Sequence, residues 1–222
     1  MIISRQRGYV FVHIPKTGGT ALALALEARA AADDILIGDT PKARARRGRV
    51  KALAGRAAGR LWKHSTLADI EGVLPREEIA GLLAVTLVRN PWDRAVSYYH
   101  WLRVQGFAHP AVGLAKAQDF RGFVSHPQTR TAARAWPYGA WTRDGAGAER
   151  TQLFVRLDHF AQDVAPFEAH LGFRLTLPRA NESERGRDWR PYFDDRTAAI
   201  VAEDCAEDIA RFGYGFDPAA GW

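Results

Sequence analysis

The chain has 222 residues, a net charge of +6 and 47% hydrophobic residues, which suits one globular domain with a sizeable core. Cys205 is the only cysteine, which excludes an intrachain disulfide and a cysteine-based metal cluster. No apolar run is long enough to cross a bilayer, and the first residues lack the apolar core of a signal peptide, so we expect a cytoplasmic protein. The positive charge indicates an anionic partner without identifying it.

The first strong element is a strand followed by a glycine turn and a helix. Residues 9–12 are β-branched and aromatic, which is typical of a buried strand. Pro15 stops this strand, Gly18 and Gly19 favour a tight turn, and residues 20–30 are strong helix formers. Such a junction presents backbone N–H groups and the positive end of a helix to one point. The sequence therefore predicts an anion-binding loop.

Side chains in this loop add to its capacity to bind an anion. Lys16 brings a positive charge, and Thr17 and Thr20 bring hydroxyl donors. The P-loop of nucleotide hydrolases has the order G-x-x-x-x-G-K-[ST], whereas Lys16 here precedes the two glycines. The loop thus suits a phosphate but lacks the usual arrangement for a magnesium nucleotide. The alternative is a plain strand, turn and helix with an incidental lysine.

A short strand is expected at residues 35–37, and the composition then changes to a basic arm, defined here as residues 40–63. Nine lysines and arginines run from Lys42 to Lys63, and no acid occurs from residue 40 to residue 68. Alanine and leucine between the charges predict a basic helix or a mobile arm. Its role is either a solvated face or a surface for an acceptor or an anionic membrane.

The remaining elements alternate between helix and strand, which predicts an α/β layered domain. The strand at 82–88 is apolar on nearly every residue, as expected in a parallel sheet covered on both faces. Pro91 suits the first turn of the helix that follows. The other expected segments are helices at 67–74, 77–80 and 120–124, a strand at 152–157, and helices at 159–171 and 194–212. Apart from the helix at 120–124, the stretch at 106–147 is expected to be less regular.

A second basic group follows the strand at 82–88. Arg89 comes at the end of this strand, and Ser97 lies two turns into the next helix. Ligands of open α/β sheets bind at the carboxyl ends of strands. An arginine fork and a helix hydroxyl can together hold a phosphate. Two such sites indicate a ligand with two separated anionic groups.

At these two sites the chain resembles the sulfotransferases that use 3′-phosphoadenosine 5′-phosphosulfate (PAPS). FVHIPKTGGT is similar to their 5′-phosphosulfate loop and LVRNPWDRAVSYY to their 3′-phosphate motif. The similarity extends over about two thirds of the chain and is to the branch that includes bacterial and carbohydrate sulfotransferases. It implies a three-layer, P-loop-like parallel sheet flanked by helices, in a single domain over residues 1–222 with the basic arm as an insertion.

The resemblance also implies roles for these residues. The enzymes transfer a sulfuryl group to an acceptor, here expected to be a hydroxyl of a saccharide, glycoconjugate or glycolipid. Lys16 would stabilise the charge on the leaving oxygen, and no metal is expected. The 3′-phosphate would be bound by Arg89 and Ser97. The 5′-phosphosulfate would be bound by Lys16, Thr17, Gly18, Gly19 and Thr20.

His64 is the first candidate for the base that takes the acceptor's proton. KHST is similar to the segment in which glycan-directed relatives keep a catalytic histidine, and histidine titrates near neutral pH. The alternative for His64 is a surface residue that ends the basic arm. His13 is expected to be packed or to orient the loop. A core or loop-packing role is favoured over stacking on the adenine or a sugar for three aromatic residues, Trp136, Tyr138 and Trp141.

Two other functions remain open at this point. A nucleotide-dependent kinase could use the same loop, and it would need Mg²⁺. A non-catalytic adaptor could bind nucleic acid or an anionic membrane through the basic arm, with binding that weakens steeply as salt rises. No recognised nucleic-acid module is visible, so we expect no nucleic-acid partner and keep peripheral membrane contact, from Lys42 to Lys63, as an alternative.

Overall fold

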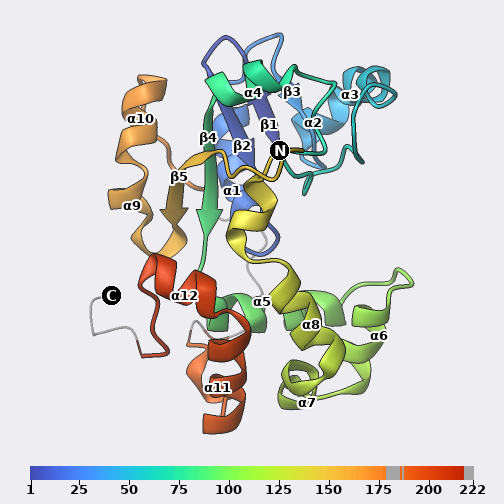
Figure 1. The fold of residues 1–222 in the computed structure, drawn as a ribbon, viewed down its shortest axis with the longest axis vertical. Coiled ribbons are helices and arrows are strands. Elements are labelled where there is room, and N and C mark those ends of the chain that lie inside the picture. The colour runs from blue at the N-terminus through green and yellow to red at the C-terminus, as the bar shows by residue number, and fades with distance from the viewer. Residues whose placement is uncertain (179–185, 187, 218–222) are drawn as a thin grey trace. The chain divides into compact units, whose positions relative to one another are not determined.

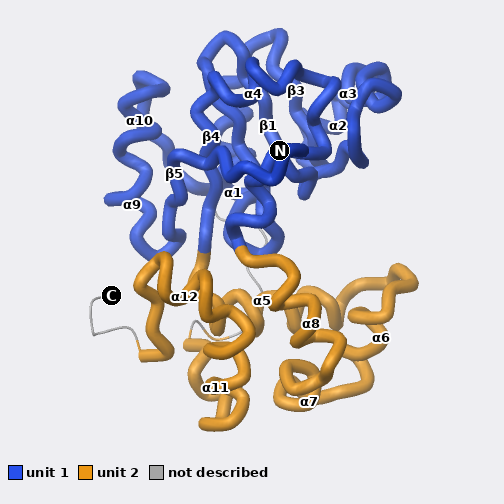
Figure 2. Tube along the Cα trace, viewed as in Figure 1, with its two compact units in different colours: residues 1–88, 138–181 blue, residues 89–137, 182–222 orange. Residues whose placement is uncertain are grey.

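The computed structural model describes residues 1–178, 186 and 188–217. The chain divides into two compact units, each built from two stretches of sequence (Figure 2). The first unit comprises residues 1–88 and 138–181, and the second comprises residues 89–137 and 182–222.

A five-stranded mixed sheet forms the centre of the first unit (Figure 1). Its strands are β1 (Ile2–Ser4), β2 (Tyr9–Val12), β3 (Ile35–Leu36), β4 (Leu83–Val88) and β5 (Thr151–Arg156), in the order β3-β1-β2-β4-β5. β2, β4 and β5 are parallel, as the sequence predicts. β1 pairs antiparallel with β2 and β3, which makes the sheet mixed. Three residues are too few to show a periodic pattern, so β1 was not expected.

Buried side chains lie on both faces of this sheet. On one face Phe11 and Val85 pack with Leu22 and Leu26 of α1 (Gly19–Glu27) and with Phe167 of α10 (Ala165–Leu171). Each such apolar side chain contributes about 1.5–3 kcal/mol when fully buried. The alternate residues of β2 and β4 point to the other face, and they are also inaccessible to solvent: Val10, Val12, Ala84 and Thr86. Burial on both faces confirms the α/β fold with a sheet flanked by other layers.

The predicted helix at 67–74 is absent, and turns take its place. The Thr66 N–H and hydroxyl both donate to the Asp69 carboxylate, at 2.7 and 3.0 Å, which favours a local turn over a helix. The Leu67 N–H donates instead to the Trp141 carbonyl in the short 3₁₀ helix η1 (Tyr138–Thr142). Gly72 has φ +85°, which a continuing α-helix cannot accommodate.

The basic arm folds as two short helices, α2 (Pro41–Ala45) and α3 (Arg47–Leu53), so the helical alternative holds for its first half. Three of its cations donate to carbonyls at and just beyond the C-terminal end of α1. Lys42 donates to the Glu27 carbonyl, and Arg46 donates to that of Ala31 at 2.7 Å. Arg49 donates to the Ala32 carbonyl. Positive charge is favourable at the C-terminal end of a helix, so these residues attach the arm to the first unit.

The first unit contains three further helices. They are α4 (Arg76–Gly81), α9 (Phe160–Asp163) and the 3₁₀ helix η2 (Leu157–His159). The predicted helix at 159–171 is therefore broken, because Val164 ends α9 and is also the N-cap of α10. Gly172 ends α10 with φ +74°, as predicted.

The second unit is helical in the residues that the structure describes. Its helices are α5 (Pro91–Arg103), α6 (Pro110–Ala117), α7 (Phe120–Ser125), α8 (Pro127–Ala135), η3 (Arg190–Tyr192), α11 (Asp195–Asp204) and α12 (Ala206–Phe212). The stretch at 106–147 is thus more regular than predicted. The Nδ1 atoms of His109 and His126 accept the Ala111 and Gln128 N–H groups and so cap α6 and α8.

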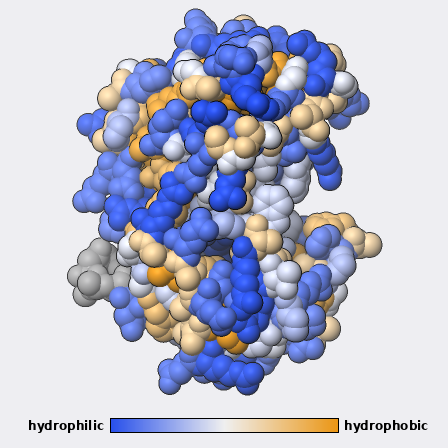
Figure 3. Space-filling view, viewed as in Figure 1, coloured by the Kyte–Doolittle hydropathy of each residue, from blue (hydrophilic) through white to orange (hydrophobic). Residues whose placement is uncertain are grey.

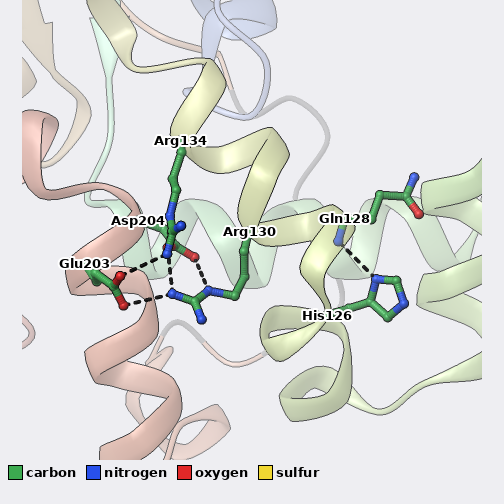
Figure 4. A network of polar contacts seen from close by, with 6 residues as sticks. All are labelled: His126, Gln128, Arg130, Arg134, Glu203 and Asp204. Carbon is green, nitrogen blue, oxygen red and sulfur yellow. Dashed lines mark hydrogen bonds and ion pairs between the residues drawn. The ribbon is translucent and has the colours of Figure 1, made fainter.

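Ion pairs attach α8 to α11 inside the second unit (Figure 4). The Arg130 and Arg134 guanidinium groups both bond the Asp204 carboxylate, through Nε at 2.9 and 2.6 Å. Glu203 accepts a further bond from each arginine. The Asp204 side chain is only 3% exposed, so the two arginines neutralise a buried charge.

Candidate active site

The predicted anion-binding loop joins β2 to α1. The Thr17 side chain is fully buried, and its hydroxyl donates to the Ile14 carbonyl at 2.9 Å, which closes the loop. Lys16 has φ +67° and Gly18 has φ +86°. Left-handed residues in such a turn aim successive N–H groups at one point, where an anion can bind. A lysine in this conformation is strained by about 1–2 kcal/mol, and strain of this kind gathers at functional sites.

The N-cap residue of α1 makes no side-chain cap hydrogen bond. Gly18 is the N-cap and cannot provide a side-chain acceptor, and the first turn contains no acidic residue. The first N–H groups of a helix have no partner within that helix, and they carry its positive end. Gly18, Gly19 and Thr20 therefore lie where a bound anion would accept their N–H groups.

Both glycines are in close contact with neighbouring side chains. A Cβ on Gly18 would lie 2.9 Å from a methyl carbon of Leu157. A Cβ on Gly19 would lie 2.2 Å from Cδ2 of His13. The buried His13 ring thus packs directly under the start of α1, as predicted for a loop-orienting residue.

His64 lies beside His13 and therefore beside the loop. The two rings are 4.7 Å apart, and the His64 Nδ1 is 2.7 Å from the His13 carbonyl oxygen. A carbonyl oxygen only accepts, so Nδ1 carries the hydrogen and Nε2 keeps its lone pair. In this tautomer Nε2 is the nitrogen that can accept a proton. The structure therefore brings His64 to the loop, although 44 residues separate it from Thr20 in the sequence.

Burial keeps both histidines neutral. It lowers the pKa of His64 to about 4, an effect opposed by the hydrogen bond to the His13 carbonyl and increased by the nearby Lys63 ammonium. Burial also lowers the pKa of His13 well below its usual value. At neutral pH the His64 imidazole is thus unprotonated, and its lowered pKa makes it a weaker base than the unperturbed histidine expected from the sequence.

Arg89 and Ser97 belong to the second unit. Arg89 forms an ion pair with Asp93 one turn further on, with Nε 2.6 Å from Oδ2, and the side chains are 18% and 16% exposed. Ser97 is buried in α5, two turns from Arg89 as predicted.

Asn90 is the N-cap of α5. The Asn90 side chain accepts the Trp92 N–H at 3.0 Å and donates to the Gly215 carbonyl at 2.9 Å. Asp93 was not among the expected site residues, although its spacing of four from Arg89 is the signal for an ion pair on a helix.

The loop and the Arg89 group follow neighbouring strands. β2 and β4 pair in parallel, with Val12 opposite Thr86, so their carboxyl ends lie at one edge of the sheet. The loop begins just after Val12, and Arg89 is the residue after Val88, the last of β4. The hypothesis that one ligand contacts both groups stays a prediction.

The remaining candidate residues fall into different environments. Tyr138 and Trp141 are buried, as predicted for core residues, whereas Trp136 is 46% exposed.

In the described part of the chain no group of three or more histidine, cysteine or acidic side chains could hold a metal ion. No helix in that part is long and apolar enough to cross a membrane.

No family model and no curated protein matches the sequence. Among solved structures, the fold is similar to mouse sulfotransferase SULT7A1 complexed with PAP, with a TM-score of 0.47 and 16% sequence identity. The similarity covers 92% of this chain and 84% of that chain.

Proposed function

We propose that the protein transfers a sulfuryl group from PAPS to a hydroxyl of a saccharide or glycoconjugate. The observation that carries the proposal is the N-terminus of α1, whose N-cap Gly18 offers no side-chain acceptor, with the left-handed Lys16 before it and a neutral His64 beside His13. An anion site and a base at one place are what transfer of an anionic group to an alcohol needs. The motif resemblance selects PAPS as the anion.

The loop would bind the 5′-phosphosulfate of this donor. The N–H groups of Gly18, Gly19 and Thr20 suit its oxygens, and the Lys16 ammonium stabilises the charge that develops on the leaving phosphate oxygen. Because the Thr17 hydroxyl already donates to Ile14, Thr17 contributes by closing the loop rather than by donating from its side chain.

His64 would take the proton of the acceptor hydroxyl. As the bond from the acceptor oxygen to sulfur forms, the bond from sulfur to the phosphate oxygen breaks, and the acceptor proton passes to Nε2. The negative charge of the bound donor raises the pKa of His64 above its value in the free protein and makes it a stronger base. Arg89 and Ser97 would bind the 3′-phosphate, with Asp93 orienting the guanidinium.

Gly19→Ala is expected to abolish binding of adenosine 3′,5′-diphosphate, the product form of the donor. The new Cβ would overlap the His13 ring and displace the first N–H groups of α1. Calorimetric titration measures the affinity, and circular dichroism shows whether the fold is kept. Gly48→Ala is the matched control, because no atom lies within 4 Å of its added Cβ. His13→Ala in the Gly19→Ala background should restore part of the binding. Undiminished affinity in Gly19→Ala alone would contradict the assignment of the loop.

The activity itself is tested with PAPS and a panel of sugar alcohols, phenols and amines in the presence of EDTA. Mass spectrometry of the acceptor and release of adenosine 3′,5′-diphosphate are the two readouts. We expect a gain of one sulfuryl group on a saccharide hydroxyl. Phosphorylation of the same acceptors with ATP and Mg²⁺, and no transfer from PAPS, would instead identify a kinase.

A further inference from the structure

The turn from Arg60 to Ser65 is built around one buried hydroxyl. Ser65 is inaccessible to solvent, and its Oγ accepts the Trp62 N–H at 2.9 Å and lies 2.8 Å from the Arg60 carbonyl oxygen. These contacts hold Arg60, Trp62 and His64 in one short, ordered segment at the end of the basic arm. The positions of their side chains are therefore linked.

Trp62 lies between a cation and the candidate base. The Arg60 guanidinium carbon is 5.2 Å from the centroid of the Trp62 ring, which is a cation–π arrangement. The Trp62 ring is 5.0 Å from the His64 ring and is 40% exposed. A guanidinium held over an aromatic face still directs its N–H groups outward in its own plane, where they can bind a carboxylate or sulfate.

No carboxylate in the described residues pairs with Arg60, and the same holds for Arg47, Lys51 and Arg56 of the basic arm. Other arginines of the first unit are neutralised, as Arg150 is by Asp144 and Arg156 by Asp163, each at 2.7 Å. Figure 3 shows a largely hydrophilic surface around α3, at the upper right of the view. The Arg60 charge over Trp62, the ring next to His64, favours an anionic ligand.

We propose that Arg60 binds an acidic group of the acceptor, and that the acceptor is therefore an acidic saccharide carrying carboxylate or sulfate groups. This inference rests on the proposed function, since it places the acceptor hydroxyl at His64. Trp62 holds Arg60 in position, and Arg60 selects the acceptor. An anionic membrane fits less well, because Trp62 is the one large exposed hydrophobic side chain of the basic arm, and a membrane-bound helix buries an apolar face.

The test is binding of a uronic-acid disaccharide and of its neutral hexose counterpart, measured by saturation-transfer NMR with adenosine 3′,5′-diphosphate present. The wild-type protein should bind the acidic sugar at least 10-fold more tightly, because a charge-assisted hydrogen bond to the Arg60 guanidinium is available only to the acidic sugar. Arg60→Gln should remove this preference and leave binding of the neutral sugar unchanged. Arg56→Gln is the matched control, an exposed arginine of the same arm with no described acidic partner, and it should behave as wild type.

Equal binding of the two sugars by the wild-type protein, or equal losses in the two variants, would overturn the proposal. So would binding to phosphatidylserine vesicles that is stronger than sugar binding and falls equally in both variants. A titration with adenosine 3′,5′-diphosphate alone shows whether the donor assignment or the acceptor assignment has failed. If the nucleotide binds and the acidic sugar shows no preference, the acceptor assignment fails and the donor assignment stands. If the acidic sugar binds without any nucleotide binding, the proposed function fails.

Discussion

Replacing Lys16 with alanine is expected to lower kcat for sulfuryl transfer by about 10²–10³, the usual effect of removing one preorganised donor from a developing charge. Lys16 lies in the loop that closes over the start of α1, and its left-handed backbone fixes where its side chain begins. Because the charge on the leaving oxygen grows only in the transition state, kcat should fall more than donor affinity does. A steady-state assay with PAPS and the acceptor measures both quantities.

Lys16→Gly separates the role of the charge from the role of the backbone. Glycine adopts a positive φ without the cost that a side chain brings, so this variant should be at least as stable as the wild type. It should nevertheless lose as much kcat as Lys16→Ala. Lys51→Ala, which removes an exposed lysine of the basic arm, is the control for a general effect of charge. Near-normal turnover in either Lys16 variant would contradict the role proposed for the ammonium group.

Replacing His64 with alanine is expected to lower kcat by about 10²–10⁴, the range for loss of a positioned general base. Donor affinity should change little, because the loop N–H groups and Lys16 are untouched. His159→Ala serves as the control, since His159 is an exposed histidine of the same unit. Normal turnover in His64→Ala would assign proton transfer to another group.

The same residue gives a pH prediction that NMR can follow in the free protein. Burial lowers the pKa of His64 to about 4, so the imidazole should remain neutral from pH 7 down to about 5 and protonate near 4. In the unfolded chain the pKa of His64 is higher, at about 6.5. The free energy of unfolding should therefore fall as the pH drops from about 6.5 to about 4. Adenosine 3′,5′-diphosphate should raise the midpoint, because a bound anion favours the imidazolium. A midpoint near 6.5 in the free protein would show that His64 is not buried as described.

The loop and the parallel strands could be predicted because short-range chemistry determines them. Residues 9–12 are apolar throughout, and Gly18 and Gly19 allow the turn that follows. The helix at 67–74 could not be excluded from its spacing alone. The N–H groups of Leu67 and Ala68 donate to carbonyls far away in the sequence, those of Trp141 and Arg143. Periodicity contains no information about such competition.

The environment of His64 was also beyond sequence reasoning. Its place near the loop depends on the His13 carbonyl and on the turn built around Ser65, and neither contact has a sequence signature. The basic arm shows the same limit. Composition revealed its charges, but only the structure shows that Lys42 and Arg46 donate to carbonyls at the end of α1 while Arg60 lies over Trp62. Arg185, part of a late basic stretch, lies outside the described residues.

The central claim is that one donor contacts both the loop and Arg89, and calorimetry with two nucleotides tests it most directly. In EDTA, adenosine 3′,5′-diphosphate should bind the wild-type protein at least 10-fold more tightly than adenosine 5′-monophosphate, since a charge-assisted bond contributes about 1.5–3 kcal/mol. Arg89→Ala should remove this difference, and Lys16→Ala should weaken both nucleotides and leave the difference intact. Equal binding of the two nucleotides by the wild-type protein, or an undiminished preference in Arg89→Ala, would contradict the account.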